Sequence, residues 1–167
     1  CHEISLNVAH KVGVDFLFNV AIDQEKRMAG VYCGDLEEAH AAGCADVARW
    51  TGVRVDRTYD VVVTTGGGYP LDQTFYQTVK GMVMALPVLH EQSHLLLLSS
   101  CAEQLGSPEY TEIMRRWAGS RRAFMADIEK NADRTLKDQW ELQMQVRVLE
   151  RIGLERAWLA SDDLEPD

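Results

Sequence analysis

The sequence contains no cluster of basic residues. Its 167 residues carry 17 Lys and Arg against 26 Asp and Glu, which gives a formal net charge of -9 at pH 7. Proteins that bind DNA or RNA draw most of their affinity from basic side chains placed on the phosphates, so nucleic acid is not an expected partner. A small anionic substrate would need a local basic site that works against the overall negative field.

Long hydrophobic runs are also missing. Apolar runs stay as short as the four leucines at 95–98, whereas a membrane-spanning helix needs about 20 apolar residues. The cysteines form no C-x-x-C pair, so neither a disulfide framework nor a thiolate zinc site is expected. These absences predict a soluble, cytoplasmic protein with reduced thiols and no membrane partner. The cysteines concerned are Cys1, Cys33, Cys44 and Cys101.

The first part of the chain has the pattern of a helix followed by a β-hairpin. Apolar residues at helical spacing predict a helix over Glu3–Val12, and two runs of β-forming residues follow at Asp15–Ile22 and Met28–Cys33. The chain starts at Cys1 without an initiator Met. It is therefore interpreted as part of a longer protein.

A second helix and a change of pattern come next. Asp35 is a suitable N-cap, with Glu38 as its capping-box partner, for an alanine-rich helix that runs to about Trp50. Residues 51–58 are polar and irregular, as expected of a linker. We interpret residues 1–50 as the end of an N-terminal, cofactor-binding domain and 59–167 as a C-terminal domain.

The C-terminal part alternates strands with helices. Strands of this kind, apolar on both faces and separated by helices, predict an α/β fold with a parallel sheet and flanking helices, preceded here by the hairpin and helix segment. Ser107-Pro108 is a good helix start, because Ser is an N-cap and Pro suits the first helical position. The expected strands are Tyr59–Thr65, His94–Ser100 and Arg156–Ser161, and the expected helices are Asp72–Leu86, one from Ser107, Arg121–Asn131 and Lys137–Ile152.

Three glycines, 66–68, directly follow the first of these strands. Glycine lets the backbone turn sharply and approach a ligand, and Asp72 is a suitable N-cap for the following helix, which is the general geometry of an anion site. The loop lacks the last glycine of G-x-G-x-x-G, and nothing in the chain matches the P-loop pattern. A dinucleotide-binding or P-loop role is therefore not supported.

The helix after the loop has two different faces. One face is apolar and predicted to lie in the core; its residues are Phe75, Val79, Met82, Val83 and Leu86. Gln73, Gln77 and Lys80 lie on the opposite side, one above another. This polar stripe is either simply solvated, or it points an amide and an ammonium into a cleft where Lys80 neutralises a carboxylate and Gln77 bonds a hydroxyl or carboxylate oxygen.

The stretch Gly66-Gly-Gly-Tyr-Pro-Leu-Asp-Gln-Thr-Phe-Tyr-Gln-Thr-Val-Lys80-Gly81 resembles the C-terminal domain of the nickel-dependent lactate racemase family. The resemblance continues through Phe16-Leu-Phe-Asn-Val20, Gly34-Asp35 with Ala39-His40, and Asp138-Gln-Trp140. The family commonly carries Asn or Ser in the loop where this chain has glycines around Gly66.

The resemblance implies a two-domain racemase or epimerase that acts on 2-hydroxy acids with a nickel-pincer nucleotide cofactor. The cofactor takes a hydride from C2 and returns it to either face, and a pair of histidines moves the hydroxyl proton. The cofactor and metal ligands belong to the N-terminal part and are not expected in this chain. The fragment alone should therefore lack cofactor and turnover, and its partners are the hydroxy acid and its own N-terminal domain.

The resemblance also assigns roles to three residues of this chain. Gln77 and Lys80 match the substrate-contacting Gln and Lys of the family, and Trp140 matches a tryptophan that lines the same cleft. For Trp140, core packing is an equally good interpretation, because Leu136 and Met144 flank it at helical spacing.

Two other classes of function are open from the sequence. His90-Glu91-Gln92-Ser93-His94 satisfies the H-E-x-x-H signature of zinc hydrolases, whose chemistry needs both histidines on one face of a helix. Pro87 and the four leucines around the motif instead favour a loop that runs into a buried strand. The other class is a non-catalytic domain that binds a small molecule, which would be favoured if Gln77 and Lys80 did not face a cleft.

Overall fold

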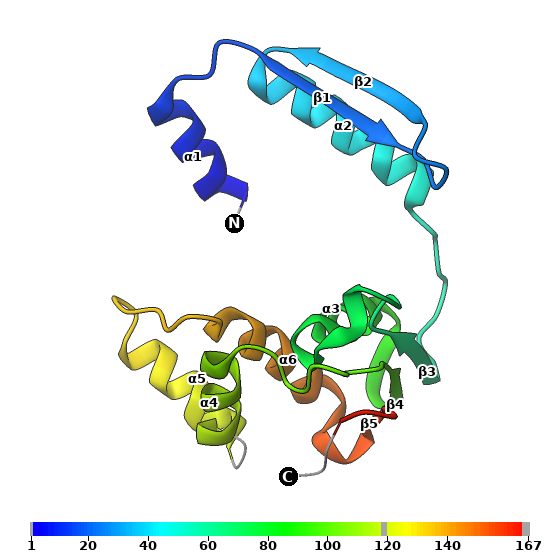
Figure 1. The fold of residues 1–167 in the computed structure, drawn as a ribbon, viewed down its shortest axis with the longest axis vertical. Helices are drawn as coiled ribbons and strands as arrows, with labels where there is room; N and C mark the ends of the chain where they lie inside the picture. Colours follow the sequence, from blue (N-terminus) through cyan, green and yellow to red (C-terminus); the bar gives the residue numbers. More distant parts are fainter. Residues whose placement is uncertain (1, 118–119, 165–167) are drawn as a thin grey trace. The chain divides into compact units, whose positions relative to one another are not determined.

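A computed structural model describes residues 2–117 and 120–164 of the chain. It contains two compact units, Cys1–Arg54 and Val55–Asp167, which are drawn together in Figure 1 and described separately below. Neither contains a helix long and apolar enough to cross a membrane, within the residues described.

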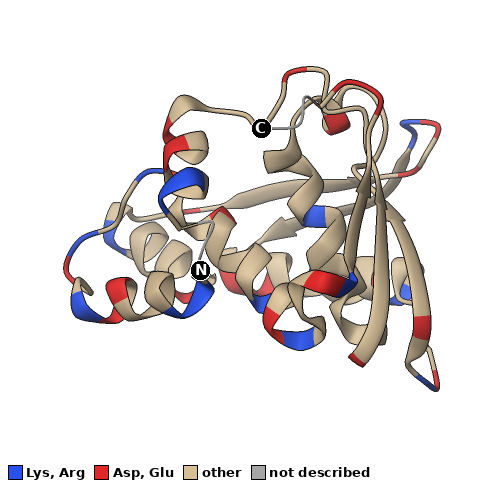
Figure 2. Ribbon diagram, turned by 90° about the horizontal axis from the view of Figure 1, so that it is seen from below, with Lys and Arg blue, Asp and Glu red and all other residues tan. Residues whose placement is uncertain are grey.

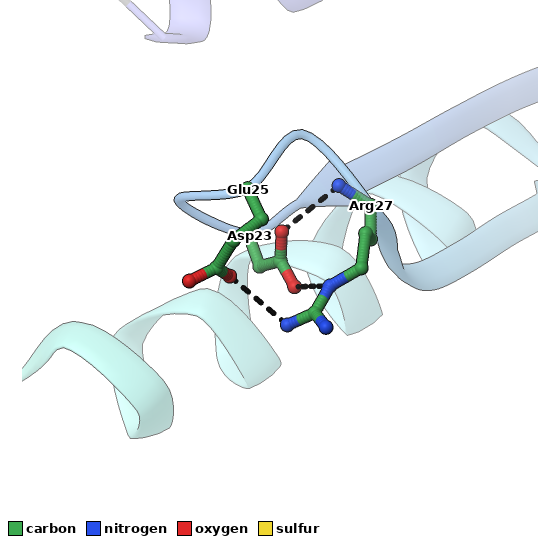
Figure 3. A network of polar contacts seen from close by, with 3 residues as sticks. All are labelled: Asp23, Glu25 and Arg27. Carbon is green, nitrogen blue, oxygen red and sulfur yellow. Dashed lines mark hydrogen bonds and ion pairs between the residues drawn. The ribbon is translucent and has the colours of Figure 1, made fainter.

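The first unit consists of α1 (His2–Val12), β1 (Leu17–Ile22), β2 (Met28–Gly34) and α2 (Leu36–Thr51). β1 and β2 pair antiparallel as the predicted hairpin, with an irregularity in register between Ala21 and Ile22. Figure 3 shows the tip of the hairpin, where the Arg27 side chain donates to Asp23 Oδ2 at 2.8 Å and to Glu25 Oε2 at 2.9 Å. These contacts close the turn between the strands.

α2 covers one face of the hairpin and begins as predicted. The Asp35 side chain accepts hydrogen bonds from the backbone N–H groups of Glu37 and Glu38, which satisfies two donors of the first helical turn. The Tyr32 hydroxyl on β2 donates to Asp46 on α2 at 3.0 Å. Hairpin and helix are thus joined by a side-chain bond as well as by packing.

The first unit buries little apolar surface by itself. Among its described residues, Ala39 is the only hydrophobic side chain that is buried. Phe18, Val20 and Ile22, at alternate positions of β1, are all exposed, as expected when one face of a hairpin packs on a helix and the described residues of the same unit do not cover the other face. Burial of apolar surface stabilises a fold by about 25 cal/mol per Å². The first unit, which buries little such surface, therefore gains little stability in this way.

The second unit contains a three-stranded parallel sheet in the order β3-β4-β5, which confirms the predicted α/β fold. Helices separate the strands in the sequence, as parallel connections require. The elements are β3 (Tyr59–Thr65), a 3-10 turn (Leu71–Gln73), α3 (Phe75–Ala85), a 3-10 turn (Leu86–Val88), β4 (Leu89–Leu98), α4 (Pro108–Trp117), α5 (Arg121–Lys130), α6 (Gln139–Ile152), a 3-10 turn (Leu154–Arg156) and β5 (Ala157–Ala160).

The core of the second unit lies where α3 and α6 pack against β4. Val79 and Met82 of α3, together with Leu95 of the central strand, are at most 1% exposed. α6 adds Val146, Val148, Leu149 and Ile152, and α4 and α5 add Tyr110, Ile113 and Phe124. Burial of each large apolar side chain contributes about 1.5–3 kcal/mol relative to its exposure, so this core stabilises the relative positions of α3 and α6.

Several elements differ in detail from the prediction. α3 begins after Thr74, whose side chain caps it, and Asp72 lies in the preceding 3-10 turn, so the prediction of Asp72 as the N-cap is wrong. β3 lies at an edge of the sheet and exposes Val61 and Val63, whereas its apolar sequence predicted a buried strand. Sequence pattern shows that a strand is apolar but not how many neighbours it has.

We expect the amides of the first unit to exchange with solvent faster than those of the second. The first unit opens at a lower free-energy cost because it has fewer buried apolar contacts. Hydrogen exchange of the chain, followed by mass spectrometry of its peptides, would measure this. Equal protection of α2 and α6 would contradict the prediction.

Candidate functional site

Gln77 and Lys80 form a hydrogen-bonded pair on the polar face of α3. The Lys80 ammonium donates to Gln77 Oε1 at 2.5 Å; Lys80 is exposed and Gln77 is half-buried. The Thr74 side chain accepts from the Gln77 backbone N–H at 3.3 Å, which fixes the first turn that carries the pair. Gln73 was predicted to belong to the same polar stripe. It lies before the helix, in the 3-10 turn, so this part of the prediction is wrong.

The close approach of α3 to β3 depends on Gly81. A side-chain carbon at this position would overlap the carbonyl oxygen of Thr65. The carbonyl of Gly81 in turn accepts a hydrogen bond from Thr64 Oγ1 at 3.3 Å. The residue that follows Lys80 therefore sets how closely the helix lies on the sheet.

Aromatic rings connect α3 to α4 and α6. Tyr76, which precedes Gln77, makes edge-to-face contacts with Tyr110 at 5.2 Å and with Trp140 at 6.0 Å between ring centroids. Trp140 is 48% exposed, so it is not a core residue, although core packing was one of the two interpretations. Its ring stands at the surface beside the helix that carries Gln77 and Lys80.

Tyr76 lies in an acidic environment. Its pKa is raised, first by burial and then by the negative charges of Asp138 and Glu141. A hydrogen bond with Trp140 acts in the opposite direction. The phenol therefore stays neutral and serves as a hydrogen-bonding group.

Glu141 is a buried acid beside the pair that sequence reasoning missed. Its side chain is 0% exposed, and neither carboxylate oxygen has a hydrogen-bond partner among the described residues. Burial is the main cause that raises its pKa from the usual 4.5 to about 7; the charge of Lys80 acts against this shift and that of Asp138 adds to it. A group with this pKa changes its charge near neutral pH.

A sequence signal for Glu141 does exist. The buried residues of α6 include Glu141, Gln145, Val148 and Ile152, which recur at spacings of four, three and four and so follow one helical stripe. Two polar residues therefore occupy the apolar register of an amphipathic helix. Gln145 has a partner, because the Tyr110 hydroxyl donates to its Oε1 at 3.2 Å.

The glycine loop lies at a hollow at the carboxyl ends of the strands. This hollow contains Asp72, Asp162 and several hydroxyl groups, and no Lys or Arg is among the described residues that line it. Asp72 Oδ1 is buried without a partner among the described residues. Two carboxylates disfavour an anion here, so the glycine loop does not supply the anion site that its sequence suggested.

The H-E-x-x-H motif lies on a strand, not on a helix. Both histidines, His90 and His94, lie on β4. The pairing of β4 with β3 shifts in register between these two residues, where Ser93 Oγ donates to the Tyr59 carbonyl at 2.7 Å. His90 Nε2 lies 3.1 Å from Asp60 Oδ1, and Trp158 donates to His94 Nδ1 at 3.4 Å. The helical geometry that zinc hydrolases need is thus absent, and the zinc interpretation is wrong.

Across residues 2–117 and 120–164, no three His, Cys, Asp or Glu side chains lie together so that they could hold a metal ion. Basic side chains are spread over several helices and turns, with acidic ones between them (Figure 2). The Gln77–Lys80 pair with its aromatic and acidic neighbours is thus the best candidate site.

The sequence pattern of the family described as lactate racemase C-terminal domain matches residues 55–155. The chain belongs to the lactate racemase C-terminal domain family. The match starts where the second unit starts, and it includes Gln77, Lys80, Trp140 and Glu141.

Relatives of the chain agree with this membership. It is 30% identical to lactate racemase of Thermoanaerobacterium thermosaccharolyticum over 89% of its length, and 29% identical to lactate racemase of Lactiplantibacillus plantarum over 99%. It superposes on the lactate racemase apoprotein of T. thermosaccharolyticum with a TM-score of 0.77, at 29% identity and over 94% of this chain. The chain spans 34% and 38% of the two relatives and 37% of the solved structure.

We expect Gly81→Ala to destabilise the second unit by about 1–3 kcal/mol, because the added methyl group forces α3 away from Thr65. Urea unfolding of this variant, of the wild type and of a control variant would measure the free energies of unfolding. Met84→Ala is the matched control: it lies on the same helix, is largely exposed and should change the stability by less than about 0.5 kcal/mol. Equal stability of the two variants would contradict the role of Gly81.

We also expect Glu141 to make stability depend on pH. A carboxyl group whose pKa is higher in the folded state stabilises that state below the unfolded pKa of about 4.5 and loses this contribution as pH rises to about 7. Glu141→Gln should therefore reduce the loss of stability between pH 4.5 and pH 7, and Glu150→Gln, on the exposed side of α6, should not. Unfolding midpoints that fall equally in both variants would refute this.

Proposed function

We propose that this chain supplies the substrate-binding residues of a racemase or epimerase for 2-hydroxy acids, as part of a longer enzyme of the lactate racemase type. The observation that carries the proposal is the Gln77–Lys80 pair on the open face of α3, inside the segment that matches the family. The names of the relatives support the reaction class.

The pair has the chemistry to hold a 2-hydroxy acid. The Lys80 ammonium has three donors and uses one on Gln77, so it can bind the substrate carboxylate with the others. The Gln77 amide nitrogen can donate to a second carboxylate oxygen or to the hydroxyl. Two contacts at one end of the molecule fix its orientation and leave C2 accessible from both faces, as racemisation requires.

The aromatic neighbours would form the wall of the site. The exposed ring of Trp140 and the Tyr76 ring against its edge present an apolar surface next to the ammonium. Apolar walls exclude water and strengthen the attraction between Lys80 and a carboxylate, because the local dielectric falls. Trp140 would thus line the substrate cleft, as the resemblance predicts.

The described residues do not fit a nickel site, since no cluster of metal ligands occurs among them. We propose that the nickel-pincer nucleotide and the acid-base histidines are held by the part of the enzyme that precedes this chain, of which residues 1–50 would be the end. Reversible removal of hydride from C2 is the chemistry this cofactor supplies when bound. Lys80 and Gln77 bind and orient the substrate for it.

We expect Lys80→Ala, in the complete enzyme with its cofactor, to lower racemisation about a hundredfold or more, because an anionic substrate loses its cationic partner. Nickel content should stay near that of the wild type. Chiral analysis of lactate and malate, together with metal analysis, would measure both.

The control for this substitution is Lys130→Ala, an exposed lysine at the end of α5, which should keep full activity. Wild-type racemisation in the Lys80 variant would refute the assignment. If no 2-hydroxy acid were racemised by the wild type but one still bound, the alternative of a non-catalytic binding domain would be supported.

A further inference from the structure

Glu141 has no part in the proposed function, yet its placement is costly. A fully buried carboxyl group without a hydrogen-bond partner loses its hydration without compensation. It follows Trp140 directly and lies on α6, the helix that packs against α3. Buried acids with strongly shifted pKa values cluster at functional sites.

The groups around Glu141 come from three parts of the fold. They are Lys80 and Tyr76 on α3, Tyr110 on α4, and Asp138 just before α6. The charge of Glu141 raises the pKa of both tyrosines. The charges of Lys80 and Asp138 in turn act on the pKa of Glu141. Lys80 is the one cation among these four neighbours. β4 also contacts α6. The titratable side chains of β4 are Glu91, which is exposed, and two histidines that contact other residues. His90 contacts Asp60, and His94 accepts from Trp158.

Two anions therefore act on the same ammonium. One is the substrate carboxylate, which Lys80 binds in the proposed function. The other is Glu141, which is buried without a hydrogen-bond partner among the described residues and acts on Lys80 through its charge, without a direct bond. An ionised Glu141 neutralises the positive charge that attracts the substrate and also repels its carboxylate. A protonated Glu141 does neither.

We propose that Glu141, buried without a hydrogen-bond partner on the helix that packs against α3, is a positioning residue of the substrate site whose charge opposes the attraction of Lys80 for the substrate carboxylate. As a neutral acid it leaves this attraction intact, and as an anion it weakens it. The inference rests on the proposed function of Lys80. Because substrate binding favours the neutral acid, binding takes up a proton wherever Glu141 is ionised in the free enzyme.

The test compares the KM for lactate from pH 6 to pH 8.5 in the complete enzyme and its Glu141→Gln and Glu150→Gln variants. With a pKa of about 7 for Glu141, the KM of the wild type should rise about tenfold between pH 6 and pH 8, since the neutral fraction falls by that factor. The KM of Glu141→Gln should stay within about twofold of its value at pH 6. Glu150→Gln should follow the wild type.

A wild-type KM that does not change with pH, or an equal rise in Glu141→Gln, would overturn the proposal. Infrared difference spectroscopy of the wild type keeps the proposal testable if Glu141→Gln fails to fold. Addition of lactate at pH 8 should increase the absorption of a neutral carboxyl group, which histidine titration does not produce. No increase would equally overturn the proposal.

The two proposals fail in different ways. If Lys80→Ala keeps full activity, the site assignment is wrong. If Lys80→Ala is inactive while the KM of the wild type is independent of pH, the site assignment stands and the role of Glu141 is wrong.

Discussion

The packing of α3 against α6 over the central strand β4 holds every group of the candidate site in place. Val79 and Met82 anchor α3 in the core and Val146 and Val148 anchor α6, so the backbone positions from which the outward side chains of both helices extend are fixed. Gln77 and Trp140 are 63 residues apart in the sequence, yet the Tyr76 ring beside Gln77 contacts the Trp140 ring. The Gln77–Lys80 pair depends on the apolar contact beneath it, and Gly81 sets how closely α3 can lie on the sheet.

The same packing creates the electrostatic character of the site. By burying α6 it removes Glu141 from water, and by bringing α3 alongside it places the charge of Lys80 within range of that carboxyl group. Burial alone favours the neutral acid, whereas the ammonium favours the anion. The two effects leave the pKa near 7, where small changes in charge nearby alter the protonation state. Binding of an anionic ligand is such a change.

Local signals in the sequence were reliable where one residue satisfies one backbone requirement. Asp35 caps α2, and Ser107 caps α4, because Ser107 Oγ accepts from the Tyr110 N–H at 3.1 Å. Asp72 failed as a cap because it lies inside the 3-10 turn that precedes the helix, and Thr74 was equally suited to the role. The H-E-x-x-H spacing was uninformative, since the same five residues can form part of a strand.

The sequence by itself determined the alternation of strands and helices, the hairpin, and the two faces of α3 that separate Val79 from Lys80. These follow from periodicity, which is a property of neighbouring residues. Its resemblance to a family also pointed to Gln77, Lys80 and Trp140, although their roles remain proposals. Only the tertiary structure decided that β3 lies at an edge, that Trp140 stands at the surface and that the helix of Glu141 packs against the helix of Lys80. These features depend on which segments pack together. Packing between segments that are distant in the sequence leaves no regular spacing of residues, so the sequence pattern does not reveal it.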